Sequence, residues 1–157
     1  MSAVAPLLVF RLDSQRYALP LPAVEHVVRA VEITPLPRAP AIVLGVIEVE
    51  GRVLPVLNVR RRFGLAEREI GPADHFVIAK TARRTVVLMV DEALNVIERP
   101  SAQVVATTEI VPGAGQIQGI IQLEDGLVLI HDLEAFLSLD EADSLDEAMQ
   151  LEAVHGS

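Results

Sequence analysis

The feature that most constrains this fold is a ribbon pattern that occurs twice in the sequence. Gly45–Val59 contains a glycine, a short strand, a tight turn with glycine and a second strand, and Gly119–Leu133 repeats that order. Glycine readily adopts the positive φ angles of tight hairpin turns, so each segment is predicted to form a β-hairpin. The turn glycines of this prediction are Gly45, Gly51, Gly119 and Gly126.

A second pair of similar segments precedes these ribbons. Phe10–Val28 is similar in pattern to Ala79–Ile97, and each is predicted to form a hairpin followed by a short turn of helix. Because the two pairs occur in the same order, they indicate an internal duplication. We therefore expect two similar small five-stranded β-barrels, over about residues 7–70 and 72–137, and leave open whether they exchange strands.

Short β-branched segments separated by prolines predict strands elsewhere in the chain. Many short strands of this kind favour barrels or a sandwich, so the expected fold class is mainly β. The predicted strands are Leu7–Leu12, Arg16–Leu19, Ile42–Glu50, Arg52–Val59, Phe76–Lys80 and Thr85–Val90.

Helix is expected only in short pieces. Pro22 suits a first helical position, and Val24, Val27 and Val28 could share one face of a helical turn. Residues 138–157 are predicted to form an acidic C-terminal helix or tail, in which Ser144 and Glu147 form a capping box.

Composition excludes several classes of partner and site. The 13 Lys and Arg against 22 Asp and Glu give a net charge of -9, which disfavours binding to nucleic acid or to an anionic membrane. The absence of cysteine excludes disulfides and thiolate metal sites. No apolar run approaches the ~20 residues of a membrane span, and no signal sequence is evident, so a soluble cytoplasmic protein without membrane insertion is expected.

The chain lacks the common catalytic and cofactor-binding motifs. Its four histidines are His26, His75, His131 and His155, and none has the spacing of a metal site. Asp74 beside His75, and His131 beside Asp132, could be acid and base pairs, but neighbouring strand residues point to opposite faces. We expect no catalytic residue, no metal and no cofactor.

One basic run, Arg60 to Arg62, follows a predicted strand. Two interpretations remain open at this point: a solvated turn, or a contact for an acidic partner.

Thr34–Gly64 carries the most specific pattern in the chain. It contains a Pro-x-Pro approach, a glycine, a strand, a tight glycine turn, and an aliphatic strand that carries proline and ends in arginine. In these features it resembles the signature of the CheW family of chemotaxis coupling proteins, and the likeness extends over residues 7–137. The residues whose spacing is similar, without gaps, are Gly45, Gly51, Pro55, Arg60, Phe63 and Gly64.

The resemblance implies a non-enzymatic adaptor made of two small SH3-like barrels. Its partners would be the regulatory domain of a CheA-type histidine kinase and the cytoplasmic tip of chemoreceptors. By position in the family, the implied kinase-binding residues are Val24, His26, Glu50 and Val53. The implied receptor-binding residues are Leu21, His75 and Val96.

Two positions depart from the family pattern. Glu50 stands where the family typically has arginine, and Asn58 stands where it typically has aspartate; Arg52 could restore part of the positive field lost at Glu50. The charge reversal motivates an alternative, a divergent regulator that binds the kinase without normal receptor coupling. Two further alternatives remain open: a small-molecule-binding β-barrel and an oligomerising structural protein.

Overall fold

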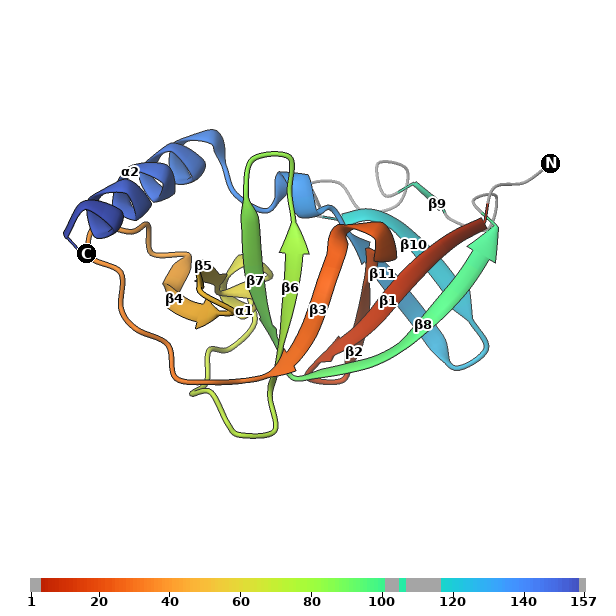
Figure 1. The fold of residues 1–157 in the computed structure, drawn as a ribbon. Helices are drawn as coiled ribbons and strands as arrows, with labels where there is room; N and C mark the ends of the chain where they lie inside the picture. The colour runs from red at the N-terminus through yellow and green to blue at the C-terminus, as the bar shows by residue number, and fades with distance from the viewer. Residues whose placement is uncertain (1–3, 101–104, 107–116, 156–157) are drawn as a thin grey trace.

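The computed structural model of the chain describes residues 4–100, 105–106 and 117–155. Within these residues the fold is mainly β, with two sheets, short helical turns and one longer C-terminal helix (Figure 1). The predictions of a mainly β fold built from two similar small units and of a C-terminal helix are confirmed. The strands are β1 (Val4–Leu12), β2 (Gln15–Pro20), β3 (Val24–Arg29), β4 (Val43–Val49), β5 (Arg52–Leu57), β6 (His75–Lys80), β7 (Thr85–Val90), β8 (Glu92–Pro100), β9 (Val105–Ala106), β10 (Ile117–Leu123) and β11 (Gly126–His131). The helical elements are η1 (Leu21–Ala23), α1 (Val59–Arg62), η4 (Leu133–Ala135) and α2 (Leu139–His155).

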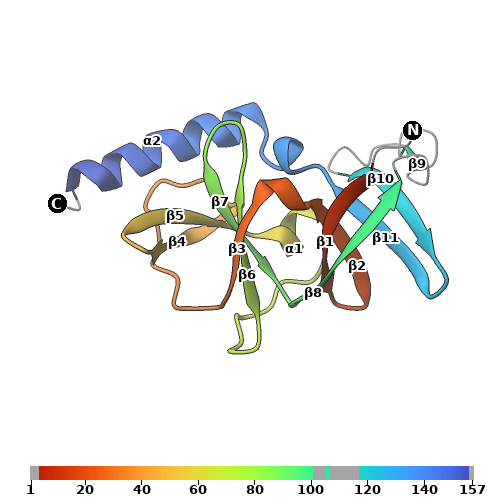
Figure 2. The same ribbon diagram turned by 45° about the vertical axis from the view of Figure 1, so that its right-hand side comes forward.

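The two sheets have matching strand orders. Over the described residues, the six-stranded sheet runs β8-β1-β2-β11-β10-β9 and the five-stranded sheet runs β3-β6-β7-β5-β4. Apart from the two-residue β9, each sheet consists of an edge strand, a hairpin, and a ribbon joined to that hairpin by a parallel pairing. Figure 2 shows the sheets side by side, with α2 over the five-stranded sheet.

The duplication is visible strand by strand. We call β1 to β5 with α1 the first repeat, and β6 to β8 with β10, β11 and η4 the second repeat. The third strand of each repeat lies in the other repeat's sheet: β3 pairs with β6, and β8 pairs with β1. The registers match, because Val24 lies opposite Ala79 while Ala93 lies opposite Phe10. Each sheet therefore contains strands from both repeats.

The two ribbons end in equivalent caps. Asn58 follows β5, and its side chain accepts a hydrogen bond from the Arg61 N–H of α1. Asp132 follows β11, and its side chain accepts one from the Glu134 N–H of η4. Both ribbons also have a register shift near their start, at Gly45 and at Gly119. The predicted hairpins at both sites are confirmed.

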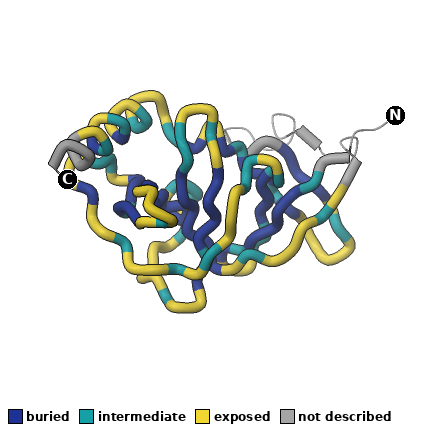
Figure 3. Tube along the Cα trace, viewed as in Figure 1, coloured by how far each residue is buried: buried dark blue, intermediate teal, exposed yellow. Residues whose placement is uncertain are grey.

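The core is continuous between the two sheets. Its largest cluster combines Leu8 and Phe10 of the six-stranded sheet with Val77 and Leu88 of the five-stranded sheet. Smaller clusters fill the rest of each sheet. In the burial map, the dark buried segments follow the inner strands, whereas loops and the outer side of α2 are exposed (Figure 3).

The helical position predicted for Pro22 is confirmed, because Pro22 lies in the first positions of the helical turn η1. Two other helix predictions were wrong. Val24–Arg29 is an edge strand, because backbone pairing with β6 outweighs the helical spacing of its valines. The C-terminal helix begins at Leu139, before the predicted capping box. Ser138 and Glu141 have the same spacing as Ser144 and Glu147 and form the box themselves: each backbone N–H donates to the other side chain, at 2.8 and 3.1 Å.

Candidate functional site

The residues predicted to bind the kinase lie on β3 and on the first ribbon, all in or beside the five-stranded sheet. His26 is exposed and Val24 is half-buried against the core. Glu50 is exposed in the turn between β4 and β5. The Val53 side chain is 48% exposed, which leaves an apolar group free at the surface.

A salt bridge joins these two segments. Glu25, between Val24 and His26, accepts a hydrogen bond from Arg52 at 3.3 Å, beside Val53. Glu25 also accepts a hydrogen bond from the Thr85 hydroxyl at 3.1 Å; this bond and the Arg52 charge lower the pKa of Glu25. The predicted kinase-binding residues are therefore brought to one region of the molecule.

The turn at Glu50 explains why glycine follows it. Glu50 and Gly51 have φ angles of 50° and 81°, the positive pair that a tight two-residue hairpin turn requires. Glu50 therefore presents its carboxylate at the tip of the ribbon. Because Arg52 is paired with Glu25, the charge that was expected to compensate Glu50 is already partly neutralised.

The residues predicted to bind receptors are more dispersed. Val96 lies on edge strand β8 and is 48% exposed. His75 begins β6, and its Nδ1 accepts a hydrogen bond from the Ala93 N–H at 2.9 Å, three residues from Val96 on β8. Leu21 lies in η1, half-buried against the main core. His75 and Val96 therefore lie on strands of different sheets, β6 and β8, which the hydrogen bond between His75 and Ala93 links, while Leu21 also has a packing role.

The Arg60 to Arg62 run is neither a solvated turn nor a free basic patch for an acidic partner. Arg60 is 2% exposed, and its guanidinium donates to Asp13 at 2.6 Å and to both Asp91 carboxylate oxygens at 2.8 and 2.9 Å. Arg62 donates to Glu141 of α2 at 2.6 Å. Arg61 lies 3.7 Å from Glu67. The run serves mainly to join parts of the molecule.

Arg60 is the centre of an ion-pair network at the junction of the two sheets. Arg68 adds a second guanidinium, which donates to Asp91 at 2.6 Å and to both oxygens of Asp74 at 2.7 and 2.9 Å. Burial acts to raise the pKa of Asp91, but hydrogen bonds from Arg60, the Asp13 N–H and Arg68 outweigh it and keep that pKa below its ordinary value. The network is therefore charged and internally paired.

His131 occupies a different environment, at the end of β11. Its ring is fully buried and lies edge-on to Phe63 and Phe136, with centroids 5.0 and 5.1 Å away; Phe63 in turn stacks on Tyr17 at 4.8 Å. Neither ring nitrogen has a hydrogen-bond partner among the described residues. Burial lowers the pKa of His131 to about 3, so the imidazole is neutral at ordinary pH.

The histidines do not assemble into a reactive group. His26 is exposed on β3, His75 is engaged with β8, and His131 lies between aromatic rings. The side chain of His155 lies outside the described residues. In the part of the chain that the structure describes, no group of three or more His, Asp or Glu side chains could hold a metal ion, and no helix could span a membrane.

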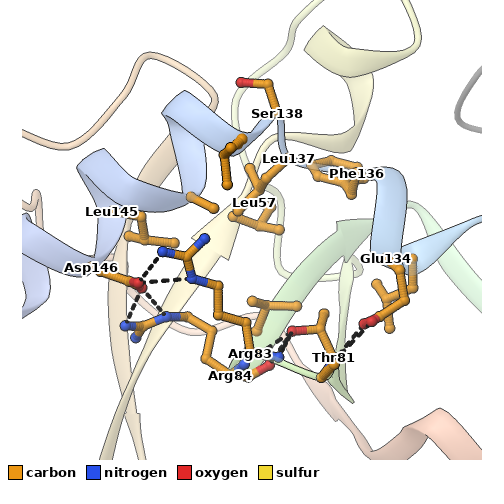
Figure 4. A pocket seen from close by; sticks show the side chains of 15 residues that line it. Leu57, Thr81, Arg83, Arg84, Glu134, Phe136, Leu137, Ser138, Leu145 and Asp146 are labelled. Atoms are coloured by element: carbon orange, nitrogen blue, oxygen red, sulfur yellow. Dashed lines mark hydrogen bonds and ion pairs between the residues drawn. The ribbon is translucent and has the colours of Figure 1, made fainter.

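A cavity of about 360 Å³ lies between α2 and the β6–β7 hairpin (Figure 4). Its apolar walls include Leu57, Val86 and Leu145, and Arg83 and Arg84 lie at its edge. The charged groups around it are already paired, since both arginines contact Asp146 at 2.7 Å. A small-molecule barrel would need polar groups free to converge on a ligand, so this cavity does not favour that alternative.

Sequence reasoning missed the junction network and the groove beneath α2. The network joins Asp13, Arg60, Arg68, Asp74 and Asp91. Its contacts to Asp13 and Asp91 link residues that are far apart in sequence, and no local pattern relates them. Pairing of charges over such separations depends on the exchange of β3 and β8, which has no sequence signature of its own.

Comparison with known proteins agrees with this fold. A family model described as CheW-like domain matches residues 6–141 of the chain. The crystal structure of scaffolding protein TtCheW from Thermoanaerobacter tengcongensis is similar with a TM-score of 0.80 at 24% identity, over 90% of this chain and 96% of that one. This likeness supports the SH3-like fold expected from the sequence.

Relatives of known sequence cover most of the chain. Chemotaxis protein CheW of Rhizobium meliloti (strain 1021) is 26% identical over 140 residues, which are 88% of this chain and 90% of that protein. Chemotaxis protein CheW of Bacillus subtilis (strain 168) is 28% identical with the same coverage. Protein FrzA of Myxococcus xanthus is 34% identical over 95 residues, 60% of this chain and 59% of FrzA.

Proposed function

Because the chain belongs to the CheW-like domain family, we propose that it is a non-enzymatic adaptor that couples a CheA-type histidine kinase to chemoreceptors in a chemosensory array. Relatives named as chemotaxis proteins, aligned over most of their length, support the adaptor role. The proposed place of action is the cytoplasm.

The observation that carries this proposal is the presence of two exposed apolar residues on different sheets. Val53 of the five-stranded sheet and Val96 of the six-stranded sheet are each 48% exposed. A continuous core and the exchanged strands β3 and β8 join the two sheets. A body of this kind can hold two partners at once, since exposed apolar groups and edge strands are typical of protein interfaces.

We propose that Val24, His26, Glu50 and Val53 contact the kinase regulatory domain, and that Leu21, His75 and Val96 contact the receptor tip. Glu50 and Glu25 contribute negative charge to the kinase-facing region, and Arg52 is paired with Glu25. The cognate kinase should therefore present a basic side chain opposite Glu50, a reversal of the charge pattern typical of the family.

A pair of valine variants tests the two surfaces. Val53→Asp should weaken binding of the cognate kinase regulatory domain at least ~10-fold while sparing the receptor fragment, because a charge would be buried at the contact. Val96→Asp should do the reverse. Val31→Asp is the matched control, since Val31 is 50% exposed and belongs to neither set. Equal loss of both partners in either variant, or no loss in both, would contradict the assignment.

Glu50 provides a separate test of the charge reversal. Glu50→Arg should weaken binding of the cognate kinase ~10-fold or more, because like charges would face each other. Glu124→Arg is the control: Glu124 is exposed at the aligned position in the turn of the second ribbon. Tighter kinase binding by Glu50→Arg would show that the kinase is acidic at this contact and would overturn the proposed reversal.

A second candidate function rests on the same residue. If Glu50 marks a divergent regulator that binds the kinase without normal receptor coupling, Glu50→Arg should raise receptor-dependent kinase activity in reconstituted arrays. Unchanged array activity would remove the reason for this alternative.

A further inference from the structure

Over residues 139–150, whose side chains the structure describes, helix α2 is attached to the body of the protein by few apolar contacts. Leu145 and Ala148 are fully buried in the main core cluster, and Met149 is half-buried against it. Ion pairs add to this attachment: Arg62 contacts Glu141 at 2.6 Å, Arg83 contacts Asp143 at 2.6 Å and Asp146 at 2.7 Å, and Arg84 contacts Asp146 at 2.7 Å. A single ion pair with this much exposed surface contributes little to stability, so α2 is held by a narrow apolar stripe together with several weak ion pairs.

The groove beneath α2 is not filled by the helix. The cavity of about 360 Å³ extends under its first turns, where Ala142 presents only a methyl group to the walls. The cavity is partly open to solvent, so α2 leaves part of the groove uncovered. A helix with a larger side chain in place of Ala142 would fill the groove better.

The arginines at the edge of the groove are held in place. In the β6–β7 turn the Thr81 hydroxyl accepts hydrogen bonds from the N–H groups of Arg83 and Arg84, at 3.2 and 3.0 Å. Figure 4 shows both arginine side chains extending from this turn to Asp146 on α2. Arg62 contacts Glu141 and lies over the ring of Phe136, which lines the groove, so a third guanidinium is paired with α2 beside it. Such a surface is complementary to an amphipathic helix with carboxylates beside its apolar stripe.

We propose that the groove between the β6–β7 hairpin and η4 is a third interaction surface, which accepts an acidic amphipathic helix of a partner protein, and that α2 occupies it as an intramolecular competitor. The bound α2 shows the chemistry that fits: carboxylates for Arg62, Arg83 and Arg84, and an apolar stripe like that of Leu145 and Ala148. The unfilled cavity favours a partner helix with a bulkier side chain. This proposal is independent of the kinase and receptor surfaces, which involve none of these residues.

A labelled peptide tests the groove directly. The probe is a peptide of residues 138–155 that carries Ala142→Leu, titrated into the full chain and followed by fluorescence anisotropy. Asp143→Asn with Asp146→Asn in the full chain removes three ion pairs of α2 at once. This should weaken the docking of its own helix and tighten peptide binding ~10-fold or more, because the tethered helix competes at high effective concentration. Arg83→Glu with Arg84→Glu, added to that chain, should abolish peptide binding.

Two further variants make the result specific. Asp140→Asn with Glu147→Gln removes two exposed carboxylates of α2 that lie outside these ion pairs, and it should leave peptide affinity unchanged. Ala142→Leu in the full chain should fill the cavity, tighten its own helix and weaken peptide binding several-fold. Failure of the peptide to bind the Asp143→Asn, Asp146→Asn chain would overturn the proposal. Dimerisation of that chain would also overturn it, since the occupant would then be α2 of a second copy.

Discussion

The two repeats share strand order, hairpin caps and the positions of exposed apolar residues, but they differ in what each ribbon leads to. Val53 in the first ribbon and Leu127 at the aligned position in the second are 48% and 47% exposed. After the first ribbon, Arg60 enters a charged network; at the end of the second, His131 lies unpaired between aromatic rings. The two repeats thus share their backbone and outer surface but differ in the polar residues buried after each ribbon.

The difference is one between two ways of burying a polar side chain. The charges around Arg60 are satisfied by each other, so they fix how the sheets meet and make the removal of one partner costly. His131 is buried as a neutral ring, so its cost depends on pH. The Arg60 network is therefore expected to stabilise the fold at all ordinary pH values, whereas the contribution of His131 to stability changes with pH.

The largest effect is expected at Asp91. Asp91→Ala should lower the free energy of unfolding by about 3–5 kcal/mol, because it leaves the buried Arg60 guanidinium with the Asp13 carboxylate and the Ala66 carbonyl but without its buried ionic partner. Urea unfolding followed by circular dichroism measures the change. The control is Asp125→Ala, which removes the exposed ionic partner of Arg16 and should change the free energy of unfolding far less than Asp91→Ala does. If Asp91→Ala and Asp125→Ala lowered the free energy of unfolding by similar amounts, the network around Arg60 would not be what joins the sheets.

Gly45 comes next, because it admits a close backbone approach at the start of the first ribbon. A Cβ there would lie 2.3 Å from the Thr34 carbonyl oxygen and 2.6 Å from the Ile33 side chain, at a φ of 153°. Gly45→Ala should therefore destabilise the protein by about 3 kcal/mol through overpacking and strain. Gly51→Ala, with the space around its Cβ open and a φ of 81°, should cost about 1–2 kcal/mol, as urea unfolding would show. An equal or smaller cost at Gly45 would contradict the close approach.

The comparison of the two repeats also shows which features could be predicted from the sequence. The turns at Gly51 and Gly126 were predictable because hairpin chemistry is local, and the strands beside them followed from their β-branched residues. The exchange of β3 and β8 depends on tertiary pairing, so Val24–Val28 was wrongly predicted as a helical turn. The pairing of Arg60 with Asp91 depends on that exchange, whereas the exposure of Glu50 followed from its turn.

His131 should give the protein a pH-dependent stability. Its pKa is about 3 in the folded chain and 6.5 for an ordinary histidine, so the unfolded chain takes up the proton first. The free energy of unfolding should be greatest above pH 6.5 and fall by about 1.4 kcal/mol per pH unit as the pH decreases toward 3. By pH 5 this amounts to about 2 kcal/mol.

Replacing His131 with the residue type at the aligned position of the first repeat isolates its effect on pH-dependent stability. Aligning Gly45 with Gly119 places Leu57, which is also buried, opposite His131. His131→Leu should therefore fold at neutral pH and lose the pH dependence between about 6.5 and 4, while the exposed His26→Leu keeps it. Urea unfolding across this range provides the comparison. An unchanged slope in His131→Leu would show that protonation elsewhere determines the acid sensitivity.

The smallest effect is expected at the two caps, where the repeats differ by a single atom. Asn58 accepts the Arg61 N–H and also donates to Glu67 at 2.6 Å, a bond that aspartate cannot make. Asn58→Asp should therefore cost about 0.5–1 kcal/mol at neutral pH, because two carboxylates would then face each other beside the ribbon. The cost should disappear in a Glu67→Gln background, where an amide can donate to the new carboxylate, and a double-mutant cycle measures this coupling. Asp132→Asn should be nearly neutral, since Asp132 acts as an acceptor for Glu134. If Asn58→Asp still lowered the free energy of unfolding in the Glu67→Gln background, the loss would come from the cap bond to Arg61. The hydrogen bond between Asn58 and Glu67 would then not explain why asparagine occupies this position.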